Sequence, residues 1–256
     1  MSIFTKQTGE DEYRAYRLFA AAGVPVPHVL SYESGILSLE NCGESHTAGW
    51  AQLERMIDMA ADLHAFFWDN YDAFGQVGLP WRLDSPKNFA RHCGAMKKSI
   101  KPYCKAHGMD TDVFRRALDY FRAQMPERME TRFHAGKNIT VLHGDLHPGN
   151  VLLPKTDGGR ALFIDLEAVR MGLGAEDLVM LLALHTAPEK EKALPLLERY
   201  HRRLCESVSG YAFEALLADY RIFLAEGLFF PVKLWINGTD GRDMMARALQ
   251  AWQEFQ

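Results

Sequence analysis

The chain has 256 residues, a formal net charge of -4 and a hydrophobic content of 48%, which together predict a compact globular protein. The net charge is slightly negative, whereas DNA or RNA binding requires a basic surface. We therefore expect no nucleic acid partner. No apolar leader follows Met1, and no apolar run approaches the roughly 18 residues of a membrane span. We therefore expect a cytoplasmic protein without a membrane partner. The four cysteines lack metal-ligand spacing and are interpreted as reduced thiols.

Residues 1–43 predict a small lobe that is rich in strands and contains one helix. The prolines of VPVPHVL force an extended backbone before a strand can form, and Ser34-Gly35 has the composition of a hairpin turn. Apolar side chains recur at helical spacing only between the first two strands, and Gly23 ends that pattern. The expected elements are strands at residues 3–6, 28–32 and 36–40 and a helix at residues 10–22.

Residues 44–256 predict a larger lobe that is mainly helical. Between residues 50 and 67, apolar side chains recur at steps of three and four, which is the spacing of an amphipathic helix. The predicted fold class is therefore α+β, with a reduced strand-rich N-terminal lobe and a large helical C-terminal lobe. Further helices are expected at residues 88–106, 111–124, 175–184, 194–207, 213–230 and 242–255.

The segment HGDLHPGN carries the residue types that phosphoryl transfer needs. In-line transfer requires an acceptor for the proton of the attacking hydroxyl and oxygen ligands for magnesium. Asp145 and Asn150 stand five residues apart, the D-x-x-x-x-N spacing of a kinase catalytic loop. In such a loop the aspartate orients the hydroxyl and the asparagine binds a metal ion.

A second metal ligand is expected beyond the next hairpin. Two short apolar runs, residues 151–153 and 161–164, are joined by the turn-rich residues 155–160. This pattern predicts a β-hairpin with Asn150 before it and Asp165 after it, facing the same space. Glu167 lies two residues further on and would point the same way along an extended backbone, as a second-ranked magnesium ligand.

The motifs HGDLHPGNVLL, IDLEAVR and GAEDL, in this order, resemble the aminoglycoside phosphotransferase and choline kinase superfamily. The resemblance runs from about residue 6 to about residue 232 and implies a protein-kinase-like fold. It also implies that Asp145 is the catalytic base and that Asn150 and Asp165 hold magnesium. The residues expected to support the catalytic loop are a buried carboxylate, Asp177, together with His143 and His147.

The small lobe supplies the remaining candidate residues, which would bind the nucleotide. Kinase-like folds place a strand lysine on the phosphates and hold it with a helix glutamate, and Lys6 and Glu12 fit these positions. Residues 39–43 would form the hinge that faces the adenine, with Glu40 and Cys42 as the candidate contacts. Only five residues precede Lys6, so no glycine-rich loop is found before it.

The sequence thus predicts a phosphotransferase that moves the γ-phosphoryl group of ATP or GTP to a hydroxyl of a small molecule. Relatives of this type act on aminoglycosides, choline, sugars and related alcohols, and the sequence does not select among these acceptors. Two alternatives stay open at this stage. One is a pseudokinase that binds nucleotide without turnover because phosphate cover is missing, and the other is a metal-dependent hydrolase.

Overall fold

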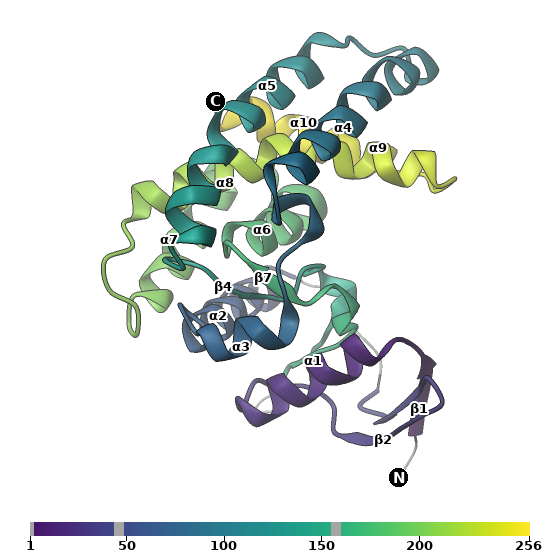
Figure 1. Cartoon of the computed structure of the whole chain (residues 1–256), viewed down its shortest axis with the longest axis vertical. Coiled ribbons are helices and arrows are strands. Elements are labelled where there is room, and N and C mark those ends of the chain that lie inside the picture. Colours follow the sequence, from purple (N-terminus) through teal and green to yellow (C-terminus); the bar gives the residue numbers. More distant parts are fainter. Residues whose placement is uncertain (1–2, 44–48, 155–159) are drawn as a thin grey trace.

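The computed structural model describes residues 3–43, 49–154 and 160–256, and these form a small lobe and a large lobe (Figure 1). The small lobe, with α1, β1 and β2, lies at one end of the molecule (Figure 1). The large lobe fills the rest, with α4 and α5 reaching furthest from the small lobe (Figure 1). The boundary predicted between residues 43 and 44 adjoins residues 44–48, which lie outside the described residues, and it stays a prediction.

The small lobe is an antiparallel sheet of order β1-β3-β2 packed against one helix. Ser34 and Gly35 both have positive φ angles, 51° and 79°, as expected of a tight hairpin turn between β2 and β3. Leu37 and Leu39 are buried and alternate with less buried positions along β3. The predicted elements are therefore present: β1 (Ile3–Gln7), α1 (Glu10–Ala21), β2 (Val29–Glu33) and β3 (Ile36–Glu40).

The large lobe is built from helices, with two short two-stranded ribbons at the end that faces the small lobe. One ribbon pairs β4 (Thr140–Leu142) with β7 (Arg170–Gly172), and the other pairs β5 (Val151–Leu152) with β6 (Leu162–Phe163). The helices are α2 (Trp50–Phe66), α3 (Tyr71–Val77), α4 (Pro86–His107), α5 (Asp112–Arg128), α6 (Ala175–Leu178), α7 (Lys190–Leu204), α8 (Phe213–Gly227), α9 (Phe229–Ile236) and α10 (Arg242–Glu254).

The predicted helix at residues 213–230 is wrong in one respect, because the structure divides it into α8 and α9. Pro231 explains the break. Proline lacks an N–H group, and its ring would clash with the carbonyl of the residue four positions earlier, Gly227, where α8 ends. The helix predicted at residues 175–184 is also modified, since α6 passes into a wider π-helical segment, Val179–Thr186.

The predicted β-hairpin that follows the catalytic loop is present. Val151 pairs with Phe163 and Leu152 with Leu162 in antiparallel register. Of the turn predicted at residues 155–160, residues 155–159 lie outside the described residues. The open end of the hairpin is closed by a backbone hydrogen bond of 3.0 Å from Ile164 N to Asn150 O. The residues before β5 and after β6 are therefore brought together.

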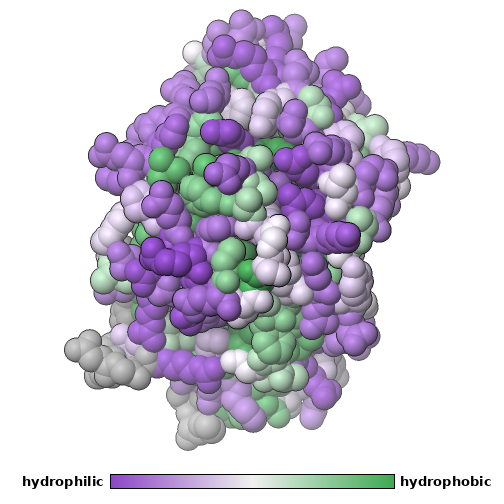
Figure 2. All heavy atoms as spheres, turned by 90° about the vertical axis from the view of Figure 1, so that its left-hand side faces the viewer, coloured by the Kyte–Doolittle hydropathy of each residue, from purple (hydrophilic) through white to green (hydrophobic). Residues whose placement is uncertain are grey.

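The core of the large lobe is formed by buried aromatic and aliphatic side chains on the inner faces of its helices. Phe114 and Phe121 are fully buried, and Phe114 packs edge to face with Tyr103 and Phe229. Hydrophilic residues cover most of the face seen in Figure 2, with hydrophobic residues in patches between them. Of the helices formed by the described residues, none has both the length and the apolar character that crossing a membrane would take.

Phe114→Ala should destabilise the large lobe by about 3–5 kcal/mol, because it removes a fully buried ring and leaves a cavity among its neighbours. Phe66→Ala is the matched control, since 52% of Phe66 is exposed and its loss should change the free energy of unfolding by less than about 0.5 kcal/mol. Urea unfolding followed by circular dichroism measures both. Equal losses would contradict the assignment of Phe114 to the core.

Candidate active site

The predicted catalytic loop, residues 143–150, leaves β4 at His143 and returns through a short 3-10 turn that ends at Asn150. The Asn150 amide Nδ2 donates to the Asp145 backbone oxygen at 2.9 Å and lies 3.3 Å from Asp145 Oδ2. Asn150 is buried, whereas 39% of the Asp145 side chain is exposed. The loop thus presents the Asp145 carboxylate to the surface, and it leaves Asn150 Oδ1 for another partner.

The buried carboxylate of Asp177 fixes the start of this loop through hydrogen bonds. Its two carboxylate oxygens accept the backbone N–H groups of His143 and Gly144, both at 2.8 Å. His64 Nε2 lies 3.1 Å from Asp177 Oδ2, and Tyr200 lies on the far side of the same imidazole. Burial by itself would raise the pKa of Asp177, but the hydrogen bond and charge of His64 outweigh it and lower that pKa. The carboxylate therefore remains ionised.

The His143 side chain joins the catalytic loop to the end of the hairpin. Its Nε2 donates to the carbonyl oxygen of Ile164 at 3.0 Å, and its Nδ1 accepts from the Asp145 N–H at 3.4 Å. Burial lowers the pKa of His143, against the opposing charge of Asp177, so the imidazole is neutral. The His143 ring therefore contacts both the backbone N–H of Asp145 and the carbonyl of Ile164, the residue before Asp165.

His147 lies beside the carboxylate of Asp145. Its Nε2 is 3.8 Å from Asp145 Oδ2, and its Nδ1 accepts the Gly149 N–H at 3.0 Å. The ring stacks on His185 with a centroid separation of 4.6 Å. Because both ring nitrogens and one ring face are engaged, the side chain keeps the second half of the loop in place.

A second group of charged side chains surrounds the ammonium group of Lys6. The Nζ atom lies 2.5 Å from Asp165 Oδ1 and 2.9 Å from Glu167 Oε1. It also lies 3.2 Å from Glu12 Oε1, so strand β1 and helix α1 supply the pair expected from the sequence. Burial would lower the pKa of Lys6, but the hydrogen bonds to Asp165 and Glu167 and the charge of Glu12 raise it.

The prediction of an extended backbone between Asp165 and Glu167 is wrong, although both carboxylates contact Lys6. Asp165 has a φ of 60°, in the left-handed region that aspartate tolerates, and Leu166–Ala168 forms a 3-10 turn instead of an extended strand. The turn is capped because the buried Glu12 carboxylate accepts the Leu166 N–H at 3.1 Å. Glu167 approaches Lys6 through this turn.

The carboxylates of Glu12, Asp165 and Glu167 form a group that fits a divalent cation. One oxygen of each lies within 4.8 Å of the others, and carboxylate oxygens are the donors that magnesium prefers. The buried Glu12 Oε2 has no hydrogen-bond partner in the described part of the chain. Glu12 was expected only as the partner of Lys6, so the structure adds it to this group. These three carboxylates match a divalent cation in the chemistry of their oxygen atoms and in the distances between them.

The two hinge candidates, Glu40 and Cys42, are engaged with the small lobe. The Glu40 N–H donates to the His28 carbonyl at 2.9 Å, and the Glu40 carboxylate accepts the His28 N–H at 3.1 Å. The Cys42 thiol lies 3.4 Å from that carboxylate, and burial together with Glu40 raises its pKa to about 11. Within residues 3–43, 49–154 and 160–256, no hydrogen bond joins either residue to Lys6 or Asp145.

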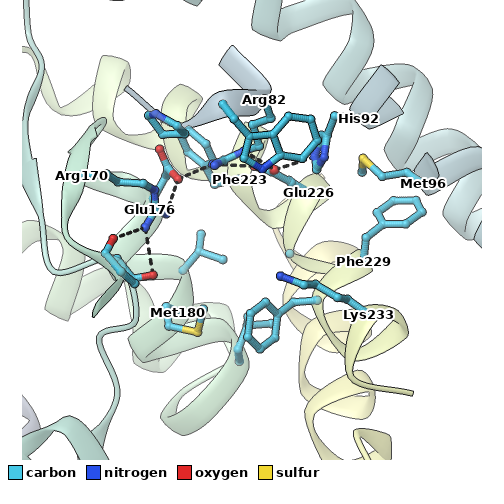
Figure 3. A pocket seen from close by; sticks show the side chains of 18 of the residues that line it. Arg82, His92, Met96, Arg170, Glu176, Met180, Phe223, Glu226, Phe229 and Lys233 are labelled. Carbon is cyan, nitrogen blue, oxygen red and sulfur yellow. Dashed lines mark hydrogen bonds and ion pairs between the residues drawn. The ribbon is translucent and has the colours of Figure 1, made fainter. Parts of the chain in front are cut away.

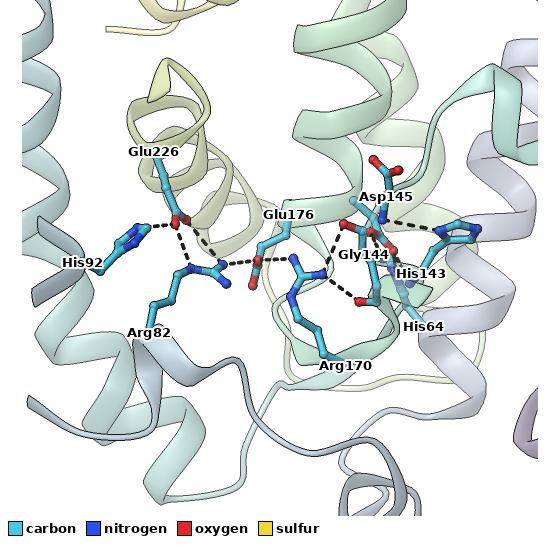
Figure 4. A network of polar contacts seen from close by, with 11 residues as sticks. His64, Arg82, His92, His143, Gly144, Asp145, Arg170, Glu176 and Glu226 are labelled. Carbon is cyan, nitrogen blue, oxygen red and sulfur yellow. Dashed lines mark hydrogen bonds and ion pairs between the residues drawn. The ribbon is translucent and has the colours of Figure 1, made fainter. Parts of the chain in front are cut away.

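An ion network that the sequence reasoning missed links the catalytic loop to the helices of the large lobe (Figure 4). Arg170 Nη1 donates to the carbonyls of Gly144 and Ala168 at 3.2 and 2.9 Å, and Arg170 Nη2 donates to Glu176 at 2.9 Å. Gly144 has a φ of 84°, and a side chain there would collide with Arg170. Arg170 and Glu176 stand inside the motif segment IDLEAVRMGLGAEDL, so their opposite charges were a usable signal.

The network continues along the wall of a cavity of about 850 Å³. Arg82 Nη2 lies 2.6 Å from Glu176 Oε2, and Arg82 Nε lies 2.7 Å from Glu226 Oε1. Figure 3 shows these groups on one side of the cavity, with Met96 and Phe229 on another. Gly144 and Glu167 also line it. The cavity therefore extends from the catalytic loop and the carboxylate group to α4, α8 and α9.

Asp177→Asn should destabilise the protein by about 1–3 kcal/mol, because one carbonyl oxygen cannot accept all three N–H groups that converge on the carboxylate. Asp62→Asn is the control, since Asp62 pairs with Arg203 at the exposed surface, where such pairs contribute about 0–1 kcal/mol. Urea unfolding compares the two. A loss for Asp177→Asn no larger than for Asp62→Asn would overturn the supporting role of Asp177.

The pH dependence of stability should include a contribution from His185. Burial, with the charges of His147 and Arg247, lowers its pKa to about 4, while in the unfolded chain the value is about 6.5. As pH falls, the unfolded state binds the proton first, so stability present above about pH 6.5 is lost between about 6.5 and about 4.

His185→Gln should therefore show a smaller fall of the urea midpoint from about pH 7 to about pH 5 than the unmodified protein. His134→Gln, at an exposed position of another helical segment, should retain the original pH profile. Identical profiles for His185→Gln and the unmodified protein would exclude this contribution.

Several solved kinase structures are similar to this chain in fold. The ethanolamine kinase of Plasmodium vivax superposes with a TM-score of 0.61 at 11% identity, covering 99% of this chain and 75% of that one. A choline kinase from Streptococcus pneumoniae gives 0.59 at 16% identity, covering 98% and 85%. A spectinomycin phosphotransferase solved with ADP and spectinomycin gives 0.59 at 12% identity, covering 98% and 80%. These likenesses confirm the kinase-like two-lobe fold.

Sequence comparison bears on the family. Curated protein sequences give no significant match. The model of the phosphotransferase enzyme family, in contrast, matches residues 3–217, which include the catalytic loop, the carboxylate group and Asp177. This match spans most of the chain and confirms the resemblance inferred from the motifs. The chain belongs to the phosphotransferase enzyme family and is, as its catalytic-loop motif predicted, a phosphotransferase.

Proposed function

We propose that the protein transfers the γ-phosphoryl group of ATP or GTP to a hydroxyl of a small molecule. The observation that carries this proposal is the junction at the open end of the β5–β6 hairpin. There His143 bonds to Ile164, so the loop that presents Asp145 is held against the segment that presents Asp165. A base for the hydroxyl and carboxylates for a metal-bound phosphate thus stand on two sides of one junction.

In the proposed reaction, the acceptor hydroxyl oxygen attacks the γ-phosphorus. A new oxygen–phosphorus bond forms, the bond from the γ-phosphorus to the bridging oxygen breaks, and the nucleoside diphosphate leaves. Asp145 is the catalytic base that orients the hydroxyl and takes its proton. The half-exposed Asp145 carboxylate, with His147 3.8 Å away, supports this role because it is accessible to a substrate and held in place.

We assign magnesium binding to Asp165 and Asn150, with Glu167 as a further candidate. Asn150 directs its amide nitrogen at Asp145, so its carbonyl oxygen is the side-chain atom that we propose as a ligand. When bound, magnesium would neutralise charge on the phosphates. Lys6 is proposed to contact the phosphates, with Glu12 holding it in position. His143, His147 and Asp177 are proposed to act through the loop they support.

The acceptor is proposed to occupy the cavity beside Gly144 and to present its hydroxyl toward Asp145. Alcohols are the acceptors named for proteins of similar fold, namely ethanolamine, choline and spectinomycin. The nucleotide is proposed to lie toward the small lobe, with its base near Glu40 and Cys42. The ADP present in the spectinomycin phosphotransferase complex supports a nucleotide as the donor.

Asp145→Asn should lower the rate of phosphoryl transfer by about 10²–10⁴-fold, because the amide can orient the hydroxyl but cannot take its proton. Asp119→Asn, at an exposed position of α5, should leave the rate unchanged. Transfer is measured as nucleoside diphosphate formation that depends on an added alcohol. Full activity in Asp145→Asn would exclude Asp145 as the base.

Thermal shift with ATP, GTP and magnesium, measured on the same proteins, separates binding from turnover. A ligand that binds the folded state raises the apparent melting temperature, so both proteins should respond to nucleotide with magnesium. Nucleotide binding without transfer to any of a broad panel of alcohols would instead favour the pseudokinase alternative. Phosphate release from phosphoesters in the absence of nucleotide would favour the hydrolase.

A further inference from the structure

The cavity beside Gly144 has a buried carboxylate, Glu176, and a partly buried one, Glu226, on its wall, and both are already bound by cationic groups of the protein. Glu226 Oε1 lies 2.7 Å from Arg82 Nε and 2.9 Å from His92 Nε2. Glu176 Oε2 accepts from Arg82 Nη2 at 2.6 Å and from Arg170 Nη2 at 2.9 Å. The negative charges that could attract a cationic acceptor are therefore neutralised inside the wall.

These pairs are difficult to displace. Burial would raise the pKa of Glu226, but the charge of Arg82 and the hydrogen bond of His92 lower it to about 2, so the carboxylate stays ionised. Only 14% of the Arg82 side chain is exposed. An acceptor amine that competed for Glu226 or Glu176 would leave a largely buried arginine without its partner, which is unfavourable.

Lys233 on α9 is a third cation, and its situation is different. Its ammonium group is directed toward the middle of the cavity (Figure 3). Within the described residues it forms no ion pair and no hydrogen bond through its side chain. It is also exposed, so its charge is available to a molecule that enters the cavity.

The charged residues of the cavity wall around Arg82 and Lys233 sum to a positive charge when Asp11 and Glu167 are set aside. Arg82, Arg170 and Lys233 oppose Glu176 and Glu226, which gives 3 - 2 = +1 with His92 counted as neutral. Two further acidic residues line the cavity, Asp11 from α1 of the small lobe and Glu167 from the turn after Asp165 in the large lobe. Asp11 is almost fully exposed, and Glu167 is paired with Lys6.

The rest of the inner wall is apolar. It surrounds Lys233 with the side chains of Met96, Met180, Phe223, Phe229, Phe230 and Val232. Such a lining stabilises a bound molecule through the burial of its carbon surface. The hydroxyl would have to lie at the opposite end, where Gly144 lines the cavity immediately before Asp145.

We propose that the acceptor is a hydroxyl compound with an apolar body and one negatively charged group, and that Lys233 binds this group. The inference rests on the proposed function of the same site and adds the charge of the substrate. It separates this chain from the ethanolamine and choline kinases of similar fold, whose named substrates carry a positive charge. Lys233 acts on specificity and takes no part in bond formation.

The test uses three alcohols of equal chain length: an ω-hydroxyalkanoate, the matching n-alkanol and the matching ω-(trimethylammonio)alkanol, each in several lengths. Two readouts are taken, kcat/KM for phosphoryl transfer and equilibrium binding of each alcohol by calorimetry with nucleoside diphosphate present. The carboxylate member should give the highest values in both. Binding is measured without turnover, so a failed transfer reaction would not hide the preference.

Lys233→Gln should reduce the values for the carboxylate member by about fivefold and leave those for the alkanol unchanged, which corresponds to about 1 kcal/mol for an accessible ion pair. Lys233→Arg should keep the preference, and Lys101→Gln, at an exposed position of α4, should behave as the unmodified protein. The proposal is overturned if the ammonium member binds as well as the carboxylate member, if no member binds, or if Lys233→Gln changes all three equally.

Discussion

The arrangement of the site depends on one buried carboxylate, Asp177. It accepts both N–H groups at the start of the catalytic loop, and His64 with Tyr200 behind it keeps it ionised and oriented. Without it, buried donors would lack acceptors, which costs more than an ordinary hydrogen bond contributes. The same helical segment continues to His185, which stacks on His147. A single segment thus supports the loop on both sides of Asp145.

A second constraint joins the two lobes at the hairpin. The Phe163 N–H donates to the Pro25 carbonyl at 2.8 Å, and the Asp165 N–H donates to the Tyr16 hydroxyl at 3.2 Å. Together with Lys6 and Glu12, these contacts attach the small lobe to the residues that follow β6. The carboxylate group is therefore shared, because α1 supplies one member and the large lobe supplies two.

Arg170 connects this centre to the acceptor side. It binds carbonyl oxygens in the catalytic loop and in the turn after Asp165, and it shares Glu176 with Arg82 on the cavity wall. The arginine therefore fixes the relative position of the two segments proposed to hold the base and the metal. It also neutralises negative charge that would otherwise face the proposed acceptor.

The local order of residues was sufficient to predict the hairpin and the phosphotransferase family, and it contains the spacing from which a catalytic loop is proposed. Asp145, Asn150 and Asp165 are close in the chain, and backbone pairing at residues 151 and 163 is a short-range consequence of apolar runs around a turn. The strands and helix of the small lobe were predicted from the positions of proline and glycine and from the spacing of apolar residues. The kinase-like fold was predicted from the resemblance of the motifs.

Tertiary structure alone decided which distant groups meet. Nothing in the spacing indicates that Arg82, Glu176 and Glu226 form one chain of ion pairs, because they come from separate helices and turns. The turn at Glu167 depends on the Glu12 carboxylate of α1, which accepts the Leu166 N–H. The break before α9 depends on the steric clash of Pro231, which the spacing of apolar residues does not reveal. The sequence by itself therefore determined the family and the spacing of the loop that is proposed to carry the chemistry. Packing between distant segments decided the charge of the cavity, because that charge is the sum of groups brought together only by the fold.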